Sequence, residues 1–436
     1  MTSKRFIFIV VFLFLSLTIL LVDNLSFLGN LYFYLIISYI GFSVISNRNF
    51  QLIDVWNGGF VFIILSEIII NRNPDMYMLS AAKYLMISNN LVNIGYLSNS
   101  KHLNQKSKGK PKEVRGSNLI TLVLLFLVSY FFFKRFSGAF TALAYGRDTS
   151  SGPGGGSLIG YLTNSIGYVL PAIIVYYFSH IKQKKIWIPL IISLPIFIIL
   201  FMGGTRFPLL FSLLGFAIVA QEKYSTRLTI KNYIIISVIG IGLLYSTKLM
   251  KTFRSTGAAE SGFTIQSNKN KNDNLAVYIS REFMSPEGVA DMTALMFKHF
   301  EKNEHLYGAS SSFILYFWIP RSFWPEKPTM LGYWFIRQYR DGFGDGHSAS
   351  FGFTGDLYAD FGLFSLIIVF FLGRLLKITD NYRRRAFNSG GYNTILGAMF
   401  YPFVFFFVRS PITSSMTFIG ILLVYILMEH VIFIKS

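Results

Sequence analysis

This chain of 436 residues contains no cysteine, which excludes disulfide bonds and metal sites built on thiolates. Charged residues are also scarce, at 14%, whereas soluble globular domains carry roughly 25%. Acidic residues are the scarcer kind, 21 against 40 basic ones, and the formal net charge is +19. The composition is therefore not that of an ordinary soluble domain.

Motifs for metals and nucleotides are absent as well. The sequence has no Walker motif and no Rossmann glycine fingerprint. No histidine or carboxylate pair stands at metal-ligand spacing in the segments that we expect on the outer face. We therefore expect no metal, no cofactor and no direct use of ATP.

Apolar residues are abundant instead. They make up 53% of the chain and occur in blocks near the roughly 20 residues that span a bilayer. The sequence thus predicts an all-α polytopic membrane protein. In such a protein the positive charge follows from basic connectors on the cytoplasmic side and from contact with anionic membrane lipid, so we expect no nucleic-acid partner.

The apolar blocks predict about twelve transmembrane helices in three regions. Residues 1–250 would hold nine helices, 251–352 a large polar loop with amphipathic helices, and 353–436 the last three helices. The predicted helices cover residues 5–22, 27–46, 51–71, 76–97, 118–134, 157–179, 187–203, 207–221, 232–250, 353–373, 391–408 and 413–433. The helix at 76–97 is the least apolar, and we expect it inside the bundle because Lys83 and its asparagines need partners.

Basic connectors predict the orientation. If the N-terminus is cytoplasmic and the helices alternate, the strongly basic connectors all fall on the cytoplasmic side, with Lys134 and Arg135 as the main exception. Both termini are then cytoplasmic and the 251–352 loop is periplasmic. The first apolar run lacks a clear cleavage site, so we interpret it as a retained helix. The glycine- and serine-rich stretch 134–157 is expected to be irregular.

Arginines at predicted helix ends on the outer face are candidate anion ligands. Arg206 lies in the turn GGTRFP, where the backbone N–H groups of a helix start would add to its charge. Arg409 lies at a similar break, RSP. For both, the alternative is an arginine that anchors a helix at the membrane interface. Further candidates on the outer side are Arg147, Arg254, Arg281 and Arg321.

The stretch before residue 353 offers a candidate base. His347 is surrounded by glycine and serine in DGFGDGHSAS, and an imidazole there can accept a proton near neutral pH. The alternative is a solvated loop histidine. Asp356 and Tyr358 follow in the first turn of the next predicted helix, where the helix dipole favours a carboxylate in any case.

Several of these stretches together resemble a known family. The helix end GGTR, the segment IPRSFWPEKP and the re-entry GHS…GDLYADFG, with the predicted topology, are similar to the O-antigen polymerase family of Wzy-type repeat-unit polymerases. The resemblance implies a GT-C-like, metal-independent, membrane-embedded glycosyltransferase of lipopolysaccharide biosynthesis in the bacterial inner membrane. Its implied substrate is an undecaprenyl-diphosphate-linked oligosaccharide, handled at the periplasmic face.

The resemblance also implies roles for the candidate residues. His347 matches a loop histidine of the related O-antigen ligases and would be catalytic, with Arg206 and Arg409. The remaining candidates, which are Arg147, Arg254, Arg281, Arg321, Asp356 and Tyr358, would bind substrate. A chain-length regulator protein is a further candidate partner. An O-antigen ligase with a lipid A-core acceptor, and a lipid-linked oligosaccharide flippase or transporter, are the alternatives.

Overall fold

Helices are the regular elements of this protein in the computed structural model, which describes residues 3–47, 50–70, 74–99, 118–145, 158–181, 186–203, 206–224, 288–320, 322–339 and 349–432. The N-terminal half contains α1 (Ser3–Leu21), α2 (Leu25–Asn47), the continuous segments α3 (Leu52–Phe60), η1 (Val61–Leu65) and α4 (Ser66–Ile70), and then α5 (Met76–Ser98), α6 (Asn118–Tyr145), α7 (Leu158–His180), α8 (Trp187–Met202) and α9 (Arg206–Tyr224). After a gap follow α13 (Val289–Phe300), α14 (Ala309–Tyr316), α15 (Leu331–Tyr339), α16 (Gly352–Phe361), η2 (Gly362–Phe364), α17 (Ser365–Ser389), α18 (Asn393–Arg409) and α19 (Pro411–Ile432).

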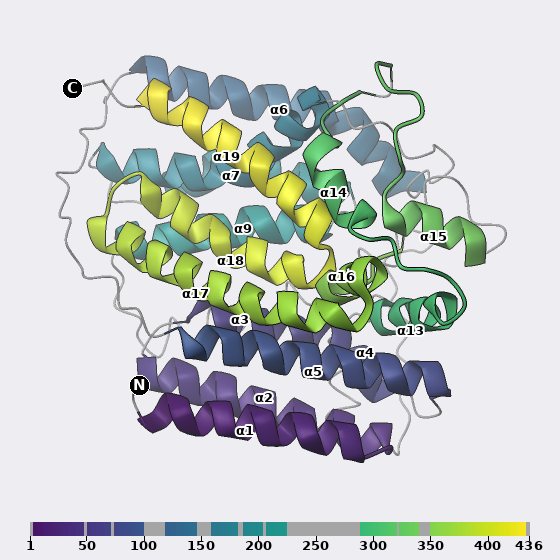
Figure 1. Cartoon of the computed structure of the whole chain (residues 1–436). Coiled ribbons are helices and arrows are strands. Elements are labelled where there is room, and N and C mark those ends of the chain that lie inside the picture. Colours follow the sequence, from purple (N-terminus) through teal and green to yellow (C-terminus); the bar gives the residue numbers. More distant parts are fainter. Residues whose placement is uncertain are drawn as a thin grey trace.

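The long helices lie side by side, and both chain termini are at one end of the bundle (Figure 1). The shorter helices α13, α14 and α15 lie at the opposite end. Within the described residues, six stretches are long and apolar enough to cross a membrane: Leu25–Ser46, Leu52–Ile70, Asn118–Ala142, Leu162–His180, Gly352–Ser389 and Pro411–Ile432. Large apolar side chains such as Phe14, Phe126 and Leu427 are exposed on the outer helices, as expected for surfaces that face lipid. These features support a multi-pass membrane protein.

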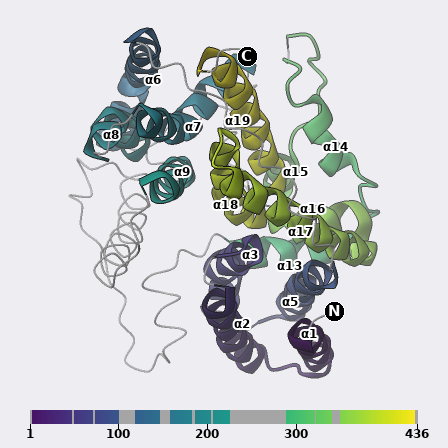
Figure 2. The ribbon, with the colours of Figure 1, turned by 90° about the vertical axis from the view of Figure 1, so that its left-hand side faces the viewer.

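Two apolar cores meet at α18. One core joins α1–α5 with α13 and α16, and it includes Val404 and Val408 of α18. The other joins α6–α9 with α19, and it includes Met399 and Phe406 from the other side of α18. Seen end-on, α1–α5 and α6–α9 form separate groups with α16–α19 between them (Figure 2). The C-terminal end of α18 is therefore surrounded by both halves of the chain.

The expected interior position of the 76–97 helix is confirmed. In α5, Asn89 accepts a hydrogen bond from Trp56 Nε1 at 2.8 Å, and Asn90 accepts one from the Tyr32 hydroxyl at 2.7 Å. Asn93 Oδ1 accepts from the Asn57 amide at 2.8 Å. All three asparagines are buried, so these bonds supply the partners that polar groups need inside a membrane.

Lys83, at the other end of α5, also has the partner that its position required. Its ammonium lies 2.5 Å from a carboxylate oxygen of Asp23, which follows α1. The pair joins the end of α1 to α5 at the end of the bundle opposite the termini.

Two predictions about elements need correction. The stretch after residue 134 does not become irregular at once, because α6 continues to Tyr145. The helix predicted at 353–373 is broken, because Gly362 has φ +56 and the chain passes through η2 before α17 extends to Ser389. The helix predicted at 232–250 lies outside the described residues, so about twelve spans and a GT-C-like fold stay predictions.

Candidate functional site

A cavity of about 210 Å³ lies between α14, α16, α17, α18 and α19. It is at the end of the bundle that carries α13–α15, opposite the termini. Its wall is mainly apolar, with Phe353, Ile368 and Phe407 among the residues that line it. Ile368 is 38% exposed on the outer surface of α17, so the cavity lies next to a face suited to lipid. The polar groups of the wall are Ser311, Asp356 and Ser415.

Asp356 is the acidic residue of this cavity. It lies in the second turn of α16, and only 8% of its surface is exposed. Its carboxylate has no hydrogen-bond or ion-pair partner among the described residues. An ionised carboxylate is strongly disfavoured in apolar surroundings unless a partner donates hydrogen bonds or positive charge. The cavity therefore presents one buried acceptor whose partner has to come from elsewhere.

Asp360, one helical turn later, has a different role. Its carboxylate accepts hydrogen bonds from the backbone N–H groups of Ser310 at 2.9 Å and Ser311 at 2.8 Å. These N–H groups belong to the first turn of α14, whose own cap residue Gly308 offers no side chain. Asp360 thus caps α14 and fixes it against α16, which closes one wall of the cavity.

Tyr358 points away from the cavity. Its ring stacks on Phe297 of α13, with the ring centroids 4.1 Å apart, and contacts Tyr84 of α5. Two residues on a helix differ by about 200° in direction, so Asp356 and Tyr358 face opposite sides of α16. The structure therefore separates these two predicted substrate-binding residues: Asp356 lines the cavity, and Tyr358 packs α16 against α13.

The C-terminal end of α18 and the N-terminal start of α9 lie near each other. Arg409 is the last residue of α18, and Arg206 is the first residue of α9. The rings of Phe211 and Phe406 stack with centroids 5.1 Å apart, which places the start of α9 beside the end of α18. Arg409 follows Phe406 by three residues and shares its side of α18, whereas Phe407 faces the cavity.

The other predicted site residues lie outside the described residues. They are His347, Arg147, Arg254, Arg281 and Arg321, and the side chain of Arg206 is likewise not described. The chain is described again from Ala349, and the hydroxyl of Ser350 donates a hydrogen bond to the main-chain oxygen of Arg409 at 2.6 Å. The segment that follows His347 is thus held at the end of α18.

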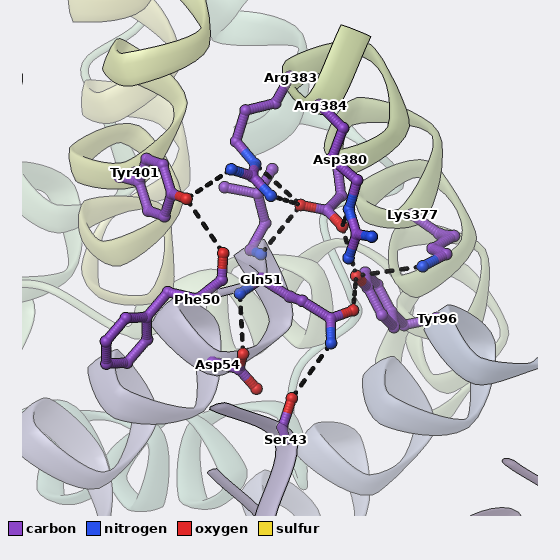
Figure 3. A network of polar contacts seen from close by, with 11 residues as sticks. Ser43, Phe50, Gln51, Asp54, Tyr96, Lys377, Asp380, Arg383, Arg384 and Tyr401 are labelled. Carbon is purple, nitrogen blue, oxygen red and sulfur yellow. Dashed lines mark hydrogen bonds and ion pairs between the residues drawn. The ribbon is translucent and has the colours of Figure 1, made fainter. Parts of the chain in front are cut away.

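Figure 3 shows a second polar cluster, which the sequence analysis did not anticipate. It lies toward the C-terminal end of α17, at the end of the bundle opposite the cavity (Figure 1). Asp380 of α17 is fully buried, and Arg383 donates to its Oδ1 through Nε at 2.9 Å. Arg384 Nε donates to Oδ2 at 3.1 Å, and the Tyr96 hydroxyl of α5 donates to the same oxygen at 2.8 Å. The Leu52 N–H at the start of α3 donates to Oδ1 at 3.3 Å. This cluster joins α3, α5 and α17.

Arg383–Arg385 belong to the basic stretch between the helices predicted at 353–373 and 391–408, which the sequence predicts as a connector, whereas the structure places them within α17. Its periodicity offered one signal for the buried pair: Asp380 stands three and four residues before Arg383 and Arg384, a spacing that brings side chains together on a helix. Because Arg383, Arg384, the Tyr96 hydroxyl and the Leu52 N–H all donate to Asp380, we assign this cluster to holding the helices and not to substrate. Within the described ranges, no group of three or more histidine, aspartate or glutamate residues could hold a metal ion.

An aromatic cluster surrounds a histidine between the short helices α13 and α15. The Nδ1 atom of His299 in α13 forms a hydrogen bond with the Tyr339 hydroxyl of α15, and the imidazole also contacts the ring of Trp334 edge-on. Partial burial lowers the pKa of His299 below its ordinary value. The cluster holds α15 against α13.

Comparison with known proteins adds no relative: no protein-family model, curated protein or solved structure matches this chain.

Proposed function

We propose that this protein polymerises undecaprenyl-diphosphate-linked oligosaccharide repeat units at the periplasmic face of the bacterial inner membrane. It transfers the growing glycan from its lipid diphosphate to a hydroxyl group of the incoming lipid-linked unit. The observation that carries the proposal is the arrangement at the end of α18. There a mainly apolar cavity with one buried carboxylate lies beside two helix ends. The first residue of α9 is Arg206, and the last residue of α18 is Arg409.

This arrangement suits an amphipathic substrate. An apolar wall next to the lipid-facing surface of α17 would accept part of a lipid-linked molecule, and the polar groups would orient its sugar. The leaving group of the proposed transfer is a diphosphate, which is already activated. Arginine guanidinium groups can bind phosphate oxygens in bidentate fashion and hold the charge that develops on the leaving group. Arg206 and Arg409 are the candidates for this role.

His347 is the proposed general base. The residue lies three positions before Ser350, which is hydrogen-bonded to Arg409. A tether of three residues spans at most about 11 Å, so the chain permits His347 and Arg409 to serve one substrate. Removal of a proton from the acceptor hydroxyl would aid its attack on the anomeric carbon.

The charge distribution supports the orientation. Lys223, Arg383, Arg384 and Arg385 lie at the C-terminal ends of α9 and α17, at the same end of the bundle as both termini. Basic residues concentrate on the cytoplasmic side of membrane proteins. The cavity would then be at the periplasmic side, where ATP is absent and a pre-activated substrate is required.

Purified protein incubated with a lipid-linked repeat unit in the presence of EDTA tests the proposal. We expect a ladder of polymers in wild type. Ladder formation should be lost in His347→Ala and Arg206→Ala and restored poorly in Arg206→Lys, because an ammonium group cannot make the bidentate contact. Glu304→Gln, at an exposed position after α13, is a matched control that should keep the ladder.

Two alternatives predict different outcomes. Loss of a polymerase from cells leaves single repeat units on the lipid A core, whereas loss of a ligase leaves none. A flippase would move the lipid-linked unit across vesicle membranes without changing its size. Wild-type protein that moves the unit and forms no ladder would exclude the polymerase.

A further inference from the structure

The carboxylate of Asp356 is a buried acidic group in the wall of the cavity. It lines the cavity, more than nine-tenths of its residue surface is buried, and no described residue donates a hydrogen bond to it. Asp360, in the same helix, is a structural carboxylate. Its two oxygens accept hydrogen bonds from the backbone N–H groups of Ser310 and Ser311. Asp356 has no comparable structural partner, and it lines the cavity.

The chemistry of the cavity restricts that ligand. A buried carboxylate requires a group that donates hydrogen bonds or carries positive charge. No basic side chain lines the cavity among the described residues, so a diphosphate would find no counter-charge beside Asp356. The cavity of about 210 Å³ is smaller than the roughly 300–1,000 Å³ of sites that enclose drug-sized ligands. It therefore suits one sugar ring and not a whole repeat unit.

The two faces of α18 divide the site. Phe407 and the start of α19 at Pro411 line the cavity, whereas Phe406 faces the start of α9. An anionic group held by Arg206 and Arg409 would lie on the Phe406 side, and the sugar hydroxyls would lie on the Phe407 side. The end of α18 would then separate the diphosphate of the donor from the sugar of the acceptor.

We infer that the cavity is the acceptor subsite, in which Asp356 accepts hydrogen bonds from hydroxyl groups of one sugar of the incoming lipid-linked unit. This inference rests on the proposed polymerase function and adds to it the division between donor and acceptor. Asp356 is a binding residue in this account, and proton transfer stays with His347. Ser415, the hydroxyl of α19 in the cavity wall, can contribute a second hydrogen bond to the same sugar.

Binding to purified protein in lipid nanodiscs tests the inference. The two probes are the lipid-linked repeat unit and undecaprenyl diphosphate, which has the same lipid and diphosphate but no sugar. In Asp356→Asn we expect affinity for the lipid-linked unit to fall about 10- to 100-fold, the size expected when one charge-assisted hydrogen bond is lost. Affinity for undecaprenyl diphosphate should stay at the wild-type value. Arg206→Ala should weaken the binding of undecaprenyl diphosphate, whose diphosphate lies on the Phe406 side, and should leave the binding of the lipid-linked unit on the Phe407 side near wild type.

Polymerisation kinetics provide the second measurement. In Asp356→Asn the KM for the lipid-linked unit should rise and kcat should change little, whereas His347→Ala should lower kcat. The Asp356→Glu variant keeps the charge and should recover part of the affinity, which a role in folding alone would not explain. Glu304→Gln should match wild type in both measurements.

The outcomes separate the two proposals. If Asp356→Asn binds both probes like wild type, or loses both equally, the acceptor subsite is rejected even when wild type forms a ladder. If wild type forms no ladder, the polymerase is rejected. The selective loss of the sugar-bearing probe in Asp356→Asn would then still establish a sugar site in the cavity.

Discussion

Replacing Asp380 by asparagine should destabilise the protein strongly. Asparagine has nearly the same shape, so the change removes the negative charge and leaves the volume of the site nearly constant. Arg383, whose side chain is only 4% exposed, would keep its positive charge with no carboxylate beside it. The two nitrogens of Arg383 now lie 2.8 and 2.9 Å from Asp380 Oδ1. Removal of one partner of a buried ion pair typically costs about 3–5 kcal/mol.

Other hydrogen bonds to Asp380 raise the expected loss of stability above the lower end of this range. Tyr96 and Leu52 also donate hydrogen bonds to Asp380, and both would face a weaker acceptor. Arg384 adds little, because its side chain is 43% exposed and water screens its charge. A loss of about 4 kcal/mol corresponds to roughly a thousandfold change in the unfolding equilibrium. It would exceed the effect of most single substitutions.

The measurement is reversible unfolding in mixed micelles, with Arg384→Ala as the matched control at the partly exposed partner. That control should lose at most about 1 kcal/mol. In the double variant Asp380→Asn/Arg383→Gln, part of the loss should be recovered because no uncompensated charge is then buried. If Asp380→Asn lost no more stability than Arg384→Ala, the cluster would not hold the helices together and our assignment would be refuted.

Three further changes test other parts of the structure. Gly373→Ala should destabilise the contact between α17 and α5 by about 1–3 kcal/mol, because its Cβ would lie 2.1 Å from the Val92 carbonyl oxygen; Gly58→Ala, with nothing within 4 Å, should be tolerated in the same unfolding assay. Glu67→Leu should expose α13 to proteolysis at a cost of about 0.5–2 kcal/mol, because Glu67 accepts the N–H groups of the first turn of α13; an unchanged cleavage rate would contradict this. The folded-state pKa of His299 is lowered, so the fold favours the neutral imidazole. The contribution of this imidazole to stability is therefore present above the ordinary pKa of 6.5 and is lost as the pH falls through the lowered pKa. The protection factors of the α13 amides, which allow for the slower intrinsic exchange at acid pH, should therefore be lower at pH 5 than at pH 7, and equal protection factors would refute the burial argument.

The candidate site could be predicted only in part. Asp356 and Tyr358 follow a predicted helix start, and the resemblance to the polymerase family implies that both bind substrate. The structure gives them opposite surroundings, since Asp356 faces the cavity and Tyr358 stacks on Phe297. Their direction depends on where α16 lies relative to α13 and α18. No local pattern contains that information.

The contrast between Asp356 and Asp360 has the same origin. Both are acidic residues on one helix, four residues apart. Asp360 caps α14, because the N–H groups of Ser310 and Ser311, some fifty residues earlier in the chain, lie within 2.9 Å of its carboxylate. No described residue donates such hydrogen bonds to Asp356, which lines the cavity.

What the sequence alone determined is the membrane-spanning character of the chain and the interior position of α5. Both follow from local properties, because the length and hydropathy of a segment decide whether it can span a bilayer, and asparagine and lysine in such a segment demand partners. Which groups become those partners is decided by the tertiary structure alone. The N–H of Leu52 and the carboxylate of Asp380 are 328 residues apart in the chain, and only the packing of α3 against α17 brings them together. The cavity depends on the packing of α14 and α16–α19 in the same way, so it could not be found from any single segment.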